Sequence, residues 1–338
     1  KNFTKYFGNK ECLATTSGTM AQYIAMKGMG IKPGDEVITQ SFTFVATIEA
    51  ILALGAIPKI VDIDDTFNID PNKIEDSITE KTKLIIPVHM LGNQCKMDEI
   101  LVIGKKNNIP VMEDACEALG ASYRGKKIGT IGDVGVFSLD FAKTITTGEG
   151  GLVISNDLKL MKYCREFHDH GHENNKIFPR GKDTRSIYGL NLRMSELQAA
   201  VGLAQLKKLN YIVEQNRKNK ALLKNNINKQ AKMQFRKIVD KDNELADTLI
   251  FYFDDKKFTN DFLKKYLELG YGTKNLPDAV DWHFAGTWTH MLKKISNSSF
   301  RHSFDLIEKS ISIPILVKQT NNEIEKHVED INNILKSI

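Results

Sequence analysis

Residues 111–151 read VMEDACEALGASYRGKKIGTIGDVGVFSLDFAKTITTGEGG, and this stretch decides the fold. It opens with an apolar run that ends in Asp114, and a second apolar run ends in Ser138, shortly before Lys143. Both runs are continuous rather than alternating, which is typical of strands that are buried on both faces of a sheet. We therefore expect two strands of a helix-covered sheet here, each followed by polar side chains at its carboxyl end.

The same pattern extends outward from this stretch. Apolar runs typical of buried strands lie at residues 36–39, 58–62, 84–88, 110–114, 135–138 and 151–155. Helical patterns lie between them at residues 19–29, 43–54 and 97–107. Because strands and helices alternate, the sequence predicts an α/β fold in which a mostly parallel central sheet is covered by helices.

The character of the sequence changes after a strongly amphipathic helix predicted at residues 194–209. Beyond it Lys, Asn and Glu become frequent, and strands are expected at residues 249–253 and 311–315. We therefore predict a large domain over residues 1–210 and a smaller C-terminal α+β domain over residues 211–338. The length of 338 residues agrees, because it exceeds the usual size of a single domain.

The composition argues against several classes of protein. The net charge of +5 comes from basic residues interleaved with acidic ones, whereas nucleic-acid binders concentrate basic residues on one face. The four cysteines have no CxxC spacing, which argues against disulfides and a metal site and favours a reducing, cytoplasmic compartment. No run reaches about 18 apolar residues and no signal peptide opens the chain, so we expect no membrane association.

The polar residues at the strand ends indicate a cofactor site. Ligands of an open α/β sheet bind outside the carboxyl ends of its strands, so Asp114, Ser138 and Lys143 can converge on one crevice. Pyridoxal 5′-phosphate (PLP) needs such a set: an amine for a Schiff base, a carboxylate for the ring nitrogen, and hydroxyl and N–H groups for the phosphate. Gly18 and Thr19, before the first long helix, offer the phosphate a close backbone approach and a hydroxyl. Taken singly, each residue is ambiguous, because strand-end Asp and Ser-Gly-Thr are usually caps and a loop Lys is usually solvated.

Several segments resemble those of one enzyme family. These segments are EDACEALGASYRG and GTIGDVGVFSLDFAKTITTGEGG within residues 113–151, TTSGTMAQYIAM at 15–26, IKPGDEVITQSFTFVATIEAIL at 31–52, PVHMLGN at 87–93 and GLNLRMSELQAAVGLAQLKKL at 189–209. They resemble the DegT/DnrJ/StrS-type sugar aminotransferases, which are PLP enzymes of the aspartate aminotransferase fold (fold type I). The resemblance covers residues 8–220 strongly and the remainder weakly, so the large domain is expected to bind the cofactor.

The resemblance implies a role for each candidate residue. Lys143 is expected to be the Schiff-base lysine and the proton shuttle, and Asp114 the partner of the pyridine nitrogen. Phe44 is expected to stack on the cofactor ring, and the expected phosphate ligands are Gly18, Thr19 and Ser138. Lys143 also favours amino transfer, because some relatives that remove a sugar 3-hydroxyl carry His at this position.

Asn191 is similar to a residue that reaches the phosphate of the neighbouring subunit, which implies a homodimer with shared active sites. Glu117 stands where the family usually has Gln or His beside the phenolic oxygen of the cofactor. Because a carboxylate there would oppose the phenolate, we expect Glu117 to be protonated or turned away. His89 and Arg193 are expected near the site, without an assigned role.

The resemblance also implies a reaction. Glutamate would donate its amino group, leaving pyridoxamine phosphate (PMP), and a keto- or aldehyde-sugar would accept the group for surface polysaccharide or lipopolysaccharide biosynthesis. The acceptor could be a nucleotide-linked hexose or, because residues 273–291 are similar to relatives that aminate carbon 8, a 3-deoxy-octulosonate such as 8-oxo-Kdo. Within this segment Trp282, His283 and Trp288 are either core residues of the second domain or a wall of the sugar pocket.

Other functions remain open at this point. The nearest alternative is a PLP-dependent sugar dehydratase or another PLP lyase on the same fold. A non-catalytic regulator that binds PLP or a sugar would be expected to carry a DNA-binding module, and no basic helix-turn-helix segment is apparent. A nicotinamide-binding enzyme would also use an α/β sheet, but no GxGxxG follows the first strand.

Overall fold

The computed structural model describes residues 1–338 apart from residues 9, 229–231 and 294. A large central sheet contains the strands β1 Glu11–Thr15, β2 Glu36–Gln40, β3 Ile57–Val61, β4 Thr82–Ile86, β5 Met112–Asp114, β8 Val134–Ser138 and β9 Gly151–Ser155. The hydrogen-bonded orders are β1-β9-β8-β5 and β3-β2-β4, and parallel bridges from Ile85 to Val111 and from Val88 to Asp114 join these two groups. Within this layer β9 is antiparallel to β1 and β8, and the other pairs are parallel, which confirms the predicted mostly parallel sheet.

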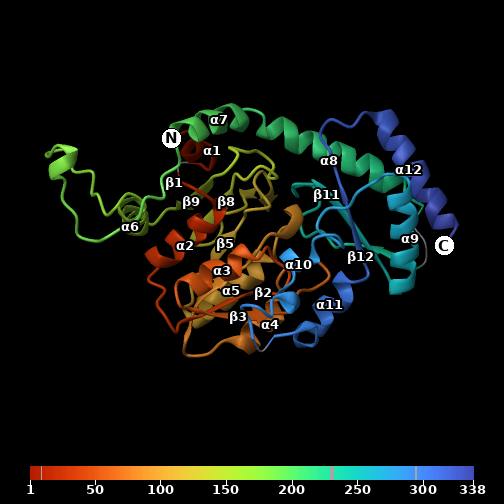
Figure 1. Cartoon of the computed structure of the whole chain (residues 1–338), viewed down its shortest axis with the longest axis horizontal. Coiled ribbons are helices and arrows are strands. Elements are labelled where there is room, and N and C mark those ends of the chain that lie inside the picture. The colour runs from red at the N-terminus through yellow and green to blue at the C-terminus, as the bar shows by residue number, and fades with distance from the viewer. Residues whose placement is uncertain (9, 229–231, 294) are drawn as a thin grey trace.

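Helices cover both faces of this sheet (Figure 1). One face packs against α2 Gly18–Gly28, α3 Ala46–Ala53 and α6 Leu158–His168, and the other against α1 Asn2–Tyr6, α4 Pro71–Ser77 and α5 Met97–Asn107. Consecutive strand residues point to opposite faces of the sheet. Val37 packs in the core on the side of α2, α3 and α6, and Ile38 packs in the core on the side of α4 and α5. This explains the continuous apolar runs, because side chains alternate along a strand and here both directions lead into a core.

The C-terminal part has a sheet and a core of its own. Its antiparallel strands are β10 Met233–Phe235, β11 Thr248–Phe253 and β12 Ser310–Pro314, covered by α8 Leu209–Asn226, α9 Lys256–Glu268 and α12 Asn321–Lys336. The short helices α10 Val280–His283 and α11 Arg301–Ile307 lie on the large sheet's side instead, since Phe284 and Ile307 belong to its core. The division after residue 210 stays a prediction, and α8 runs across it.

Most predicted elements are confirmed, with shifts of a few residues at their ends. The helix predicted at residues 194–209 is shorter, because α7 Glu196–Leu206 ends and α8 begins at Leu209. The first strand, β1, was missed, since its sequence ECLAT has no long apolar run. The smaller elements are the hairpin β6 Ser122–Tyr123 and β7 Lys126–Lys127, and the 3₁₀ helices η1 Met90–Gly92, η2 Arg180–Lys182, η3 Ala285–Thr287 and η4 Asn297–Phe300. Within the described residues, no helix combines the length and apolar character needed to cross a membrane.

Candidate active site

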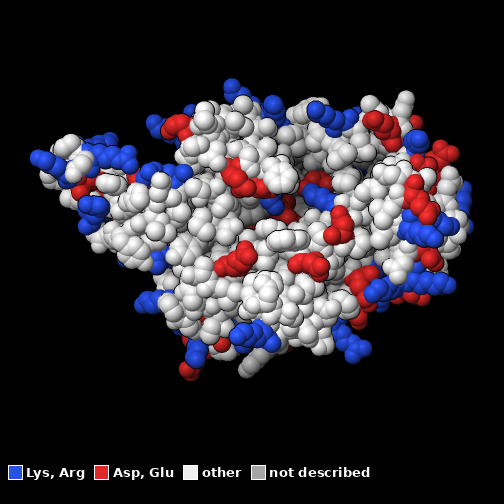
Figure 2. All heavy atoms as spheres, in the orientation of Figure 1, with Lys and Arg blue, Asp and Glu red and all other residues white. Residues whose placement is uncertain are grey.

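A cavity of about 440 Å³ opens where the large sheet meets the C-terminal part of the chain. The carboxyl ends of β5 and β8 and the N-terminus of α2 form one wall, and residues from the C-terminal part, among them Asp247 and Lys274, form the other. Figure 2 shows the molecule hollowed near the middle of its face, with acidic and basic side chains around the opening. The position agrees with the rule that ligands bind beyond the carboxyl ends of parallel strands.

Asp114 lies directly behind the wall of this cavity, at the end of β5, and is 2% exposed. Its Oδ2 accepts hydrogen bonds from Gln22 Nε2 at 3.0 Å and from Thr47 Oγ1 at 2.8 Å, and its Oδ1 accepts one from the Cys116 amide at 3.1 Å. Gln22 and Cys116 themselves line the cavity. The three donors fix the carboxylate in one orientation, as a partner for a ring nitrogen requires.

The neighbouring carboxylate has a different function, because consecutive strand residues point to opposite faces. Glu113 is fully buried, and its oxygens accept hydrogen bonds from the amides of Gly129, Ile131 and Gly132. It also contacts His89 Nε2 at 3.1 Å. Glu113 therefore fixes the turn before β8, and His89, expected near the site, serves this structural cluster.

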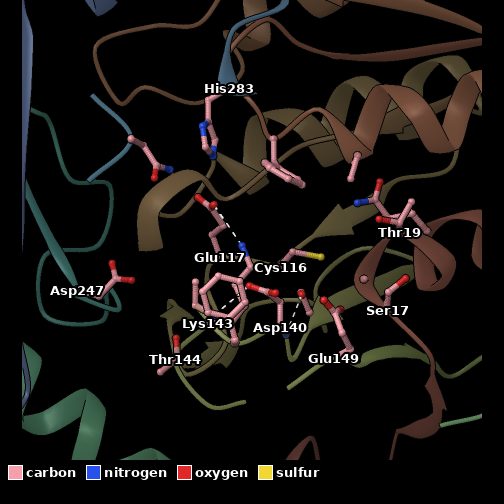
Figure 3. A pocket seen from close by; sticks show the side chains of 18 of the residues that line it. Ser17, Thr19, Cys116, Glu117, Asp140, Lys143, Thr144, Glu149, Asp247 and His283 are labelled. Carbon is pink, nitrogen blue, oxygen red and sulfur yellow. Dashed lines mark hydrogen bonds and ion pairs between the residues drawn. The ribbon is translucent and has the colours of Figure 1, made fainter. Parts of the chain in front are cut away.

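Lys143 lies in the connection between β8 and β9, which the hydrogen bond from the Leu139 amide to the Gly150 carbonyl (2.8 Å) closes at its base. Its Nζ is 3.3 Å from Glu117 Oε1, and Figure 3 shows the two side chains pointing toward each other in the cavity. Burial lowers the pKa of Lys143, but the nearby acidic groups, the Glu117 carboxylate foremost, together outweigh this effect and the net shift is upward. Without a ligand, the amine is therefore held as an ammonium.

The expectation that Glu117 is protonated or turned away is wrong for this structure. Burial would raise the pKa of Glu117, but Lys143 and other nearby cations lower it to about 2, assisted by the Leu91 amide, which donates to Oε2 at 3.0 Å. Glu117 is therefore ionised and turned into the cavity. Burial also raises the pKa of the adjacent Cys116 thiol well above its usual range, so this thiol stays protonated.

The N-terminus of α2 and the end of β8 form a cradle. A Cβ on Gly18 would lie 2.9 Å from Ser138 Cβ, so only glycine permits this close approach of helix and strand. Ser17 caps the helix by accepting from the Met20 amide, and Thr19 lines the cavity. The first turn of a helix leaves N–H groups without intrahelical partners, which makes the cradle a suitable anion site. Ser138 Oγ accepts from the Asp140 amide at 3.2 Å, so its own hydrogen can be donated to an anion.

Phe44 forms the side of the cavity above Lys143. Its ring is 40% exposed, and its centroid lies 5.9 Å from Lys143 Nζ and 5.3 Å from the centre of the His283 ring. Two hydrogen bonds, from the Thr43 amide to the His283 carbonyl at 2.9 Å and from the Val45 amide to the Trp282 carbonyl at 3.0 Å, hold these distant segments together. The exposed ring can therefore cover one face of a flat ligand.

The predicted residues do not all meet in one place. Gly18, Thr19, Phe44, Glu117, Ser138 and Lys143 line the cavity, and Asp114 is buried behind the lining residues Gln22 and Cys116. Asn191 does not line it. This exposed residue forms a β-bridge with Asp169, directly after α6. The two residues lie at the base of the arm between α6 and α7, which projects from the body in Figure 1. Arg193 likewise pairs with Asp169 outside the cavity. Trp288 is core, Trp282 is exposed, and only His283 of that group lines the cavity.

Several lining residues were missed in the sequence. Asp140, Thr144 and Glu149 flank Lys143 in its own loop, and their nearness in the chain could have revealed them. Asp247 and Lys274 form an ion pair at 2.7 Å and come from segments with no recognisable local pattern. Only the tertiary arrangement brings these two residues to the cavity.

The residues present fit PLP. The cradle suits a phosphate, a buried and fixed carboxylate lies directly behind the wall, and an amine lies in the same cavity. Gln22 Oε1, at the wall, has no hydrogen-bond partner among the described residues, although its Nε2 is bound to Asp114. A buried polar atom left in this way is typical of a site that a ligand completes.

Comparisons with known proteins agree with this geometry. The chain is 45% identical over 212 residues to the GDP-perosamine synthase of Caulobacter vibrioides, a match that covers 62% of this chain and 55% of that relative. The match thus spans about half the length of this curated relative.

Solved structures show the fold. The aminotransferase from Psychrobacter cryohalolentis superposes with a TM-score of 0.89 at 27% identity, covering 100% of this chain and 90% of that chain. NtdA from Bacillus subtilis with bound cofactor PMP superposes with a TM-score of 0.82 at 26% identity. This match covers 99% of this chain and 75% of that chain. The predicted fold type I is therefore confirmed. Because its family model matches residues 1–332, the chain belongs to the DegT/DnrJ/EryC1/StrS aminotransferase family.

Proposed function

We propose that this protein is a PLP-dependent aminotransferase that moves an amino group from glutamate to a keto-sugar. The observation that supports this most strongly is one cavity that combines the Lys143 amine, the fixed Asp114 carboxylate and the anion cradle of α2. Family membership and the PMP-bound structure of NtdA support the same cofactor. Amino transfer needs a cofactor held at both ends and a lysine free to move protons beside it.

Each residue has a proposed role. Gly18 and Thr19 at the start of α2, with the Ser138 hydroxyl, bind the phosphate. Phe44 covers one face of the ring, and Asp114 keeps the ring nitrogen protonated. Bound PLP supplies an electron-withdrawing ring that stabilises negative charge on the substrate carbon.

Lys143 performs the proton transfers. Once its Nζ is neutral, it would take the proton from the α-carbon of the donor and pass it to the cofactor on the same side of the ring. Gln22 and Thr47 hold Asp114 Oδ2 in place while the proton moves. The cavity wall excludes bulk water on the buried side, which protects the reacting carbon from unwanted hydrolysis.

The acceptor is proposed to be a nucleotide-linked keto-hexose. The name GDP-perosamine synthase, carried by a relative, specifies a GDP-linked product, which supports this class over 8-oxo-Kdo. On the wall opposite the sheet, Asp247, Lys274, Asn275 and His283 offer donors and acceptors suited to sugar hydroxyls. The product would enter surface polysaccharide or lipopolysaccharide biosynthesis.

We further propose a cytoplasmic homodimer with shared active sites. Asn191 lies on the projecting arm, and Leu197 and Val201 on α7 are 82% and 45% exposed, so this side has apolar surface for a second copy. The partner's arm would then complete the phosphate site. All four cysteines are free, which agrees with a reducing compartment.

A spectral titration tests the proposal. The purified protein with PLP should absorb at the visible edge, and glutamate alone should convert this band to that of the PMP form, with release of 2-oxoglutarate. A PLP lyase would instead leave the band in place or release ammonia. Mass spectrometry with GDP-linked keto-hexoses and 8-oxo-Kdo then identifies the acceptor. No conversion by glutamate or any other amino donor would reject amino transfer.

A further inference from the structure

Glu117 makes the closest polar contact to the Lys143 amine among the described residues. Its Oε1 lies 3.3 Å from Lys143 Nζ, and its Oε2 accepts the Leu91 amide at 3.0 Å. Both side chains are mostly buried, with exposed fractions of 13% for Glu117 and 20% for Lys143. The carboxylate is therefore held from behind by the backbone while it faces the amine.

The backbone that holds Glu117 is itself fixed. Leu91 has φ +48°, a left-handed conformation that a residue with a branched side chain rarely adopts. Such a conformation persists only where the surroundings determine it. Here Arg236 Nη2 donates to the Met90 carbonyl at 2.6 Å, and the Leu245 amide donates to the Gly92 carbonyl at 3.0 Å. The C-terminal part thus holds the turn that directs the Leu91 amide at Glu117.

The charges around the pair favour an ammonium beside a carboxylate. Besides Glu117, the Asp114 carboxylate also acts on Lys143 and raises its pKa. Besides Lys143, the Lys274 ammonium lowers the pKa of Glu117. Arg236, buried beneath the turn, is a further cation facing Glu117.

We propose that Glu117 is a positioning residue that holds the Lys143 amine as an ammonium in the cofactor-free protein and so sets the pH above which Lys143 attaches the cofactor. The inference rests on the proposed function, because it concerns attachment of PLP. For attachment, the ammonium loses a proton to solvent and the nitrogen lone pair bonds to the aldehyde carbon. The aldehyde oxygen then leaves as water. The ammonium has no lone pair, so the ion pair delays the first step.

The test follows covalent capture of PLP by cofactor-free protein at a series of pH values. Stopped-flow absorbance gives the rate, and mass spectrometry after borohydride reduction confirms the site. Glu117→Gln removes the charge and keeps an acceptor for the Leu91 amide. The midpoint of the rate profile should fall by about one pH unit, so that capture at neutral pH becomes about tenfold faster. The matched control is Glu308→Gln, which removes a carboxylate that pairs with Lys256 outside the cavity and should leave the midpoint unchanged.

An unchanged midpoint in Glu117→Gln, or an equal shift in Glu308→Gln, would overturn the inference while leaving the proposed function intact. Failure of the wild-type protein to capture PLP at Lys143 would overturn both. If Glu117→Gln does not fold, as judged by its thermal unfolding, Glu117→Asp serves instead. It withdraws the carboxylate by one methylene, so a smaller shift in the same direction is expected, and the absence of any shift counts against the inference.

Discussion

The two walls of the cavity are built in different ways. On the sheet side, Asp114, Ser138 and Lys143 follow strand ends, and Gly18 begins a helix, so regular structure determines where each group lies. On the opposite side, Asp247 and Lys274 lie in connecting segments and depend on each other for position. The difference suggests a division of work: the sheet side carries the chemistry, and the other side selects the substrate.

Replacing Lys143 by Ala removes the only side chain proposed to move protons, so it should produce the largest loss. Positioned acid–base groups contribute about 10²–10⁴-fold, and we expect the rate of amino transfer to fall by at least about 10³-fold. Turnover and the visible absorbance band measure the change. A variant that kept both the turnover and the absorbance band would contradict the assignment of the chemistry to the sheet side.

Asp114→Asn should lower the rate by about 100-fold, because a neutral amide stabilises a protonated ring nitrogen poorly. The amide keeps the shape of the carboxylate, and its oxygen can still accept from Gln22 and Thr47, although its NH₂ group then faces the Cys116 amide and cannot accept from it. Rapid-mixing measurement of the glutamate half-reaction isolates the effect. Thr47→Val is the matched control: it removes one donor and keeps the charge, and it should cost far less.

Gly18→Ala tests the cradle. Its Cβ would approach Ser138 Cβ to 2.9 Å and Cys116 Sγ to 3.2 Å, which pushes the start of α2 away from the strand end. We expect PLP to bind about tenfold more weakly, or about 1.4 kcal/mol. Equilibrium dialysis gives the affinity. Gly272→Ala meets no atom within 4 Å, lies outside the arm, and should bind PLP as the wild type does.

Asp247→Asn tests the other wall. It leaves Lys274 without its ion-pair partner, so the KM for the keto-sugar should rise by several-fold, on the order of 1 kcal/mol. The glutamate half-reaction should keep its rate if this wall serves only the sugar. Asp278→Asn alters an exposed carboxylate that binds Thr273 Oγ1 and should change neither value.

A separate prediction concerns the stability of the C-terminal part rather than either wall of the cavity. Burial lowers the pKa of His327 to about 4, and its Nε2 lies 2.8 Å from the Tyr266 hydroxyl. Between pH 4 and the ordinary value near 6.5, the unfolded chain binds more protons than the folded chain, so the free energy of unfolding falls as the pH drops through this window. We expect the free energy of unfolding, measured by thermal unfolding, to fall by about 1–2 kcal/mol across this pH window. His327→Gln should flatten this dependence, whereas the exposed His290 should not matter when replaced by Gln.

The contrast between the walls also explains how much could be predicted from the sequence. Strands β2, β4, β5 and β8 follow from apolar runs, and the polar residues that follow β5 and β8 predicted the chemical groups of the site. The protonation of Glu117 was predicted wrongly, because it depends on Lys143 and on the Leu91 turn, which come from other parts of the chain. Asp247 and Lys274 escaped notice for the same reason: no local pattern marks a residue that only tertiary structure brings to the cavity.

The central claim is that Lys143 is the attachment point of PLP on the sheet side. Its most direct test is borohydride reduction of the PLP-loaded protein, followed by tryptic digestion and peptide mass mapping. Trypsin does not cleave at a modified lysine, so the cofactor should appear on an uncleaved peptide of residues 128–159, in place of the two peptides 128–143 and 144–159. An adduct on Lys274 instead, with both shorter peptides unmodified, would contradict the account.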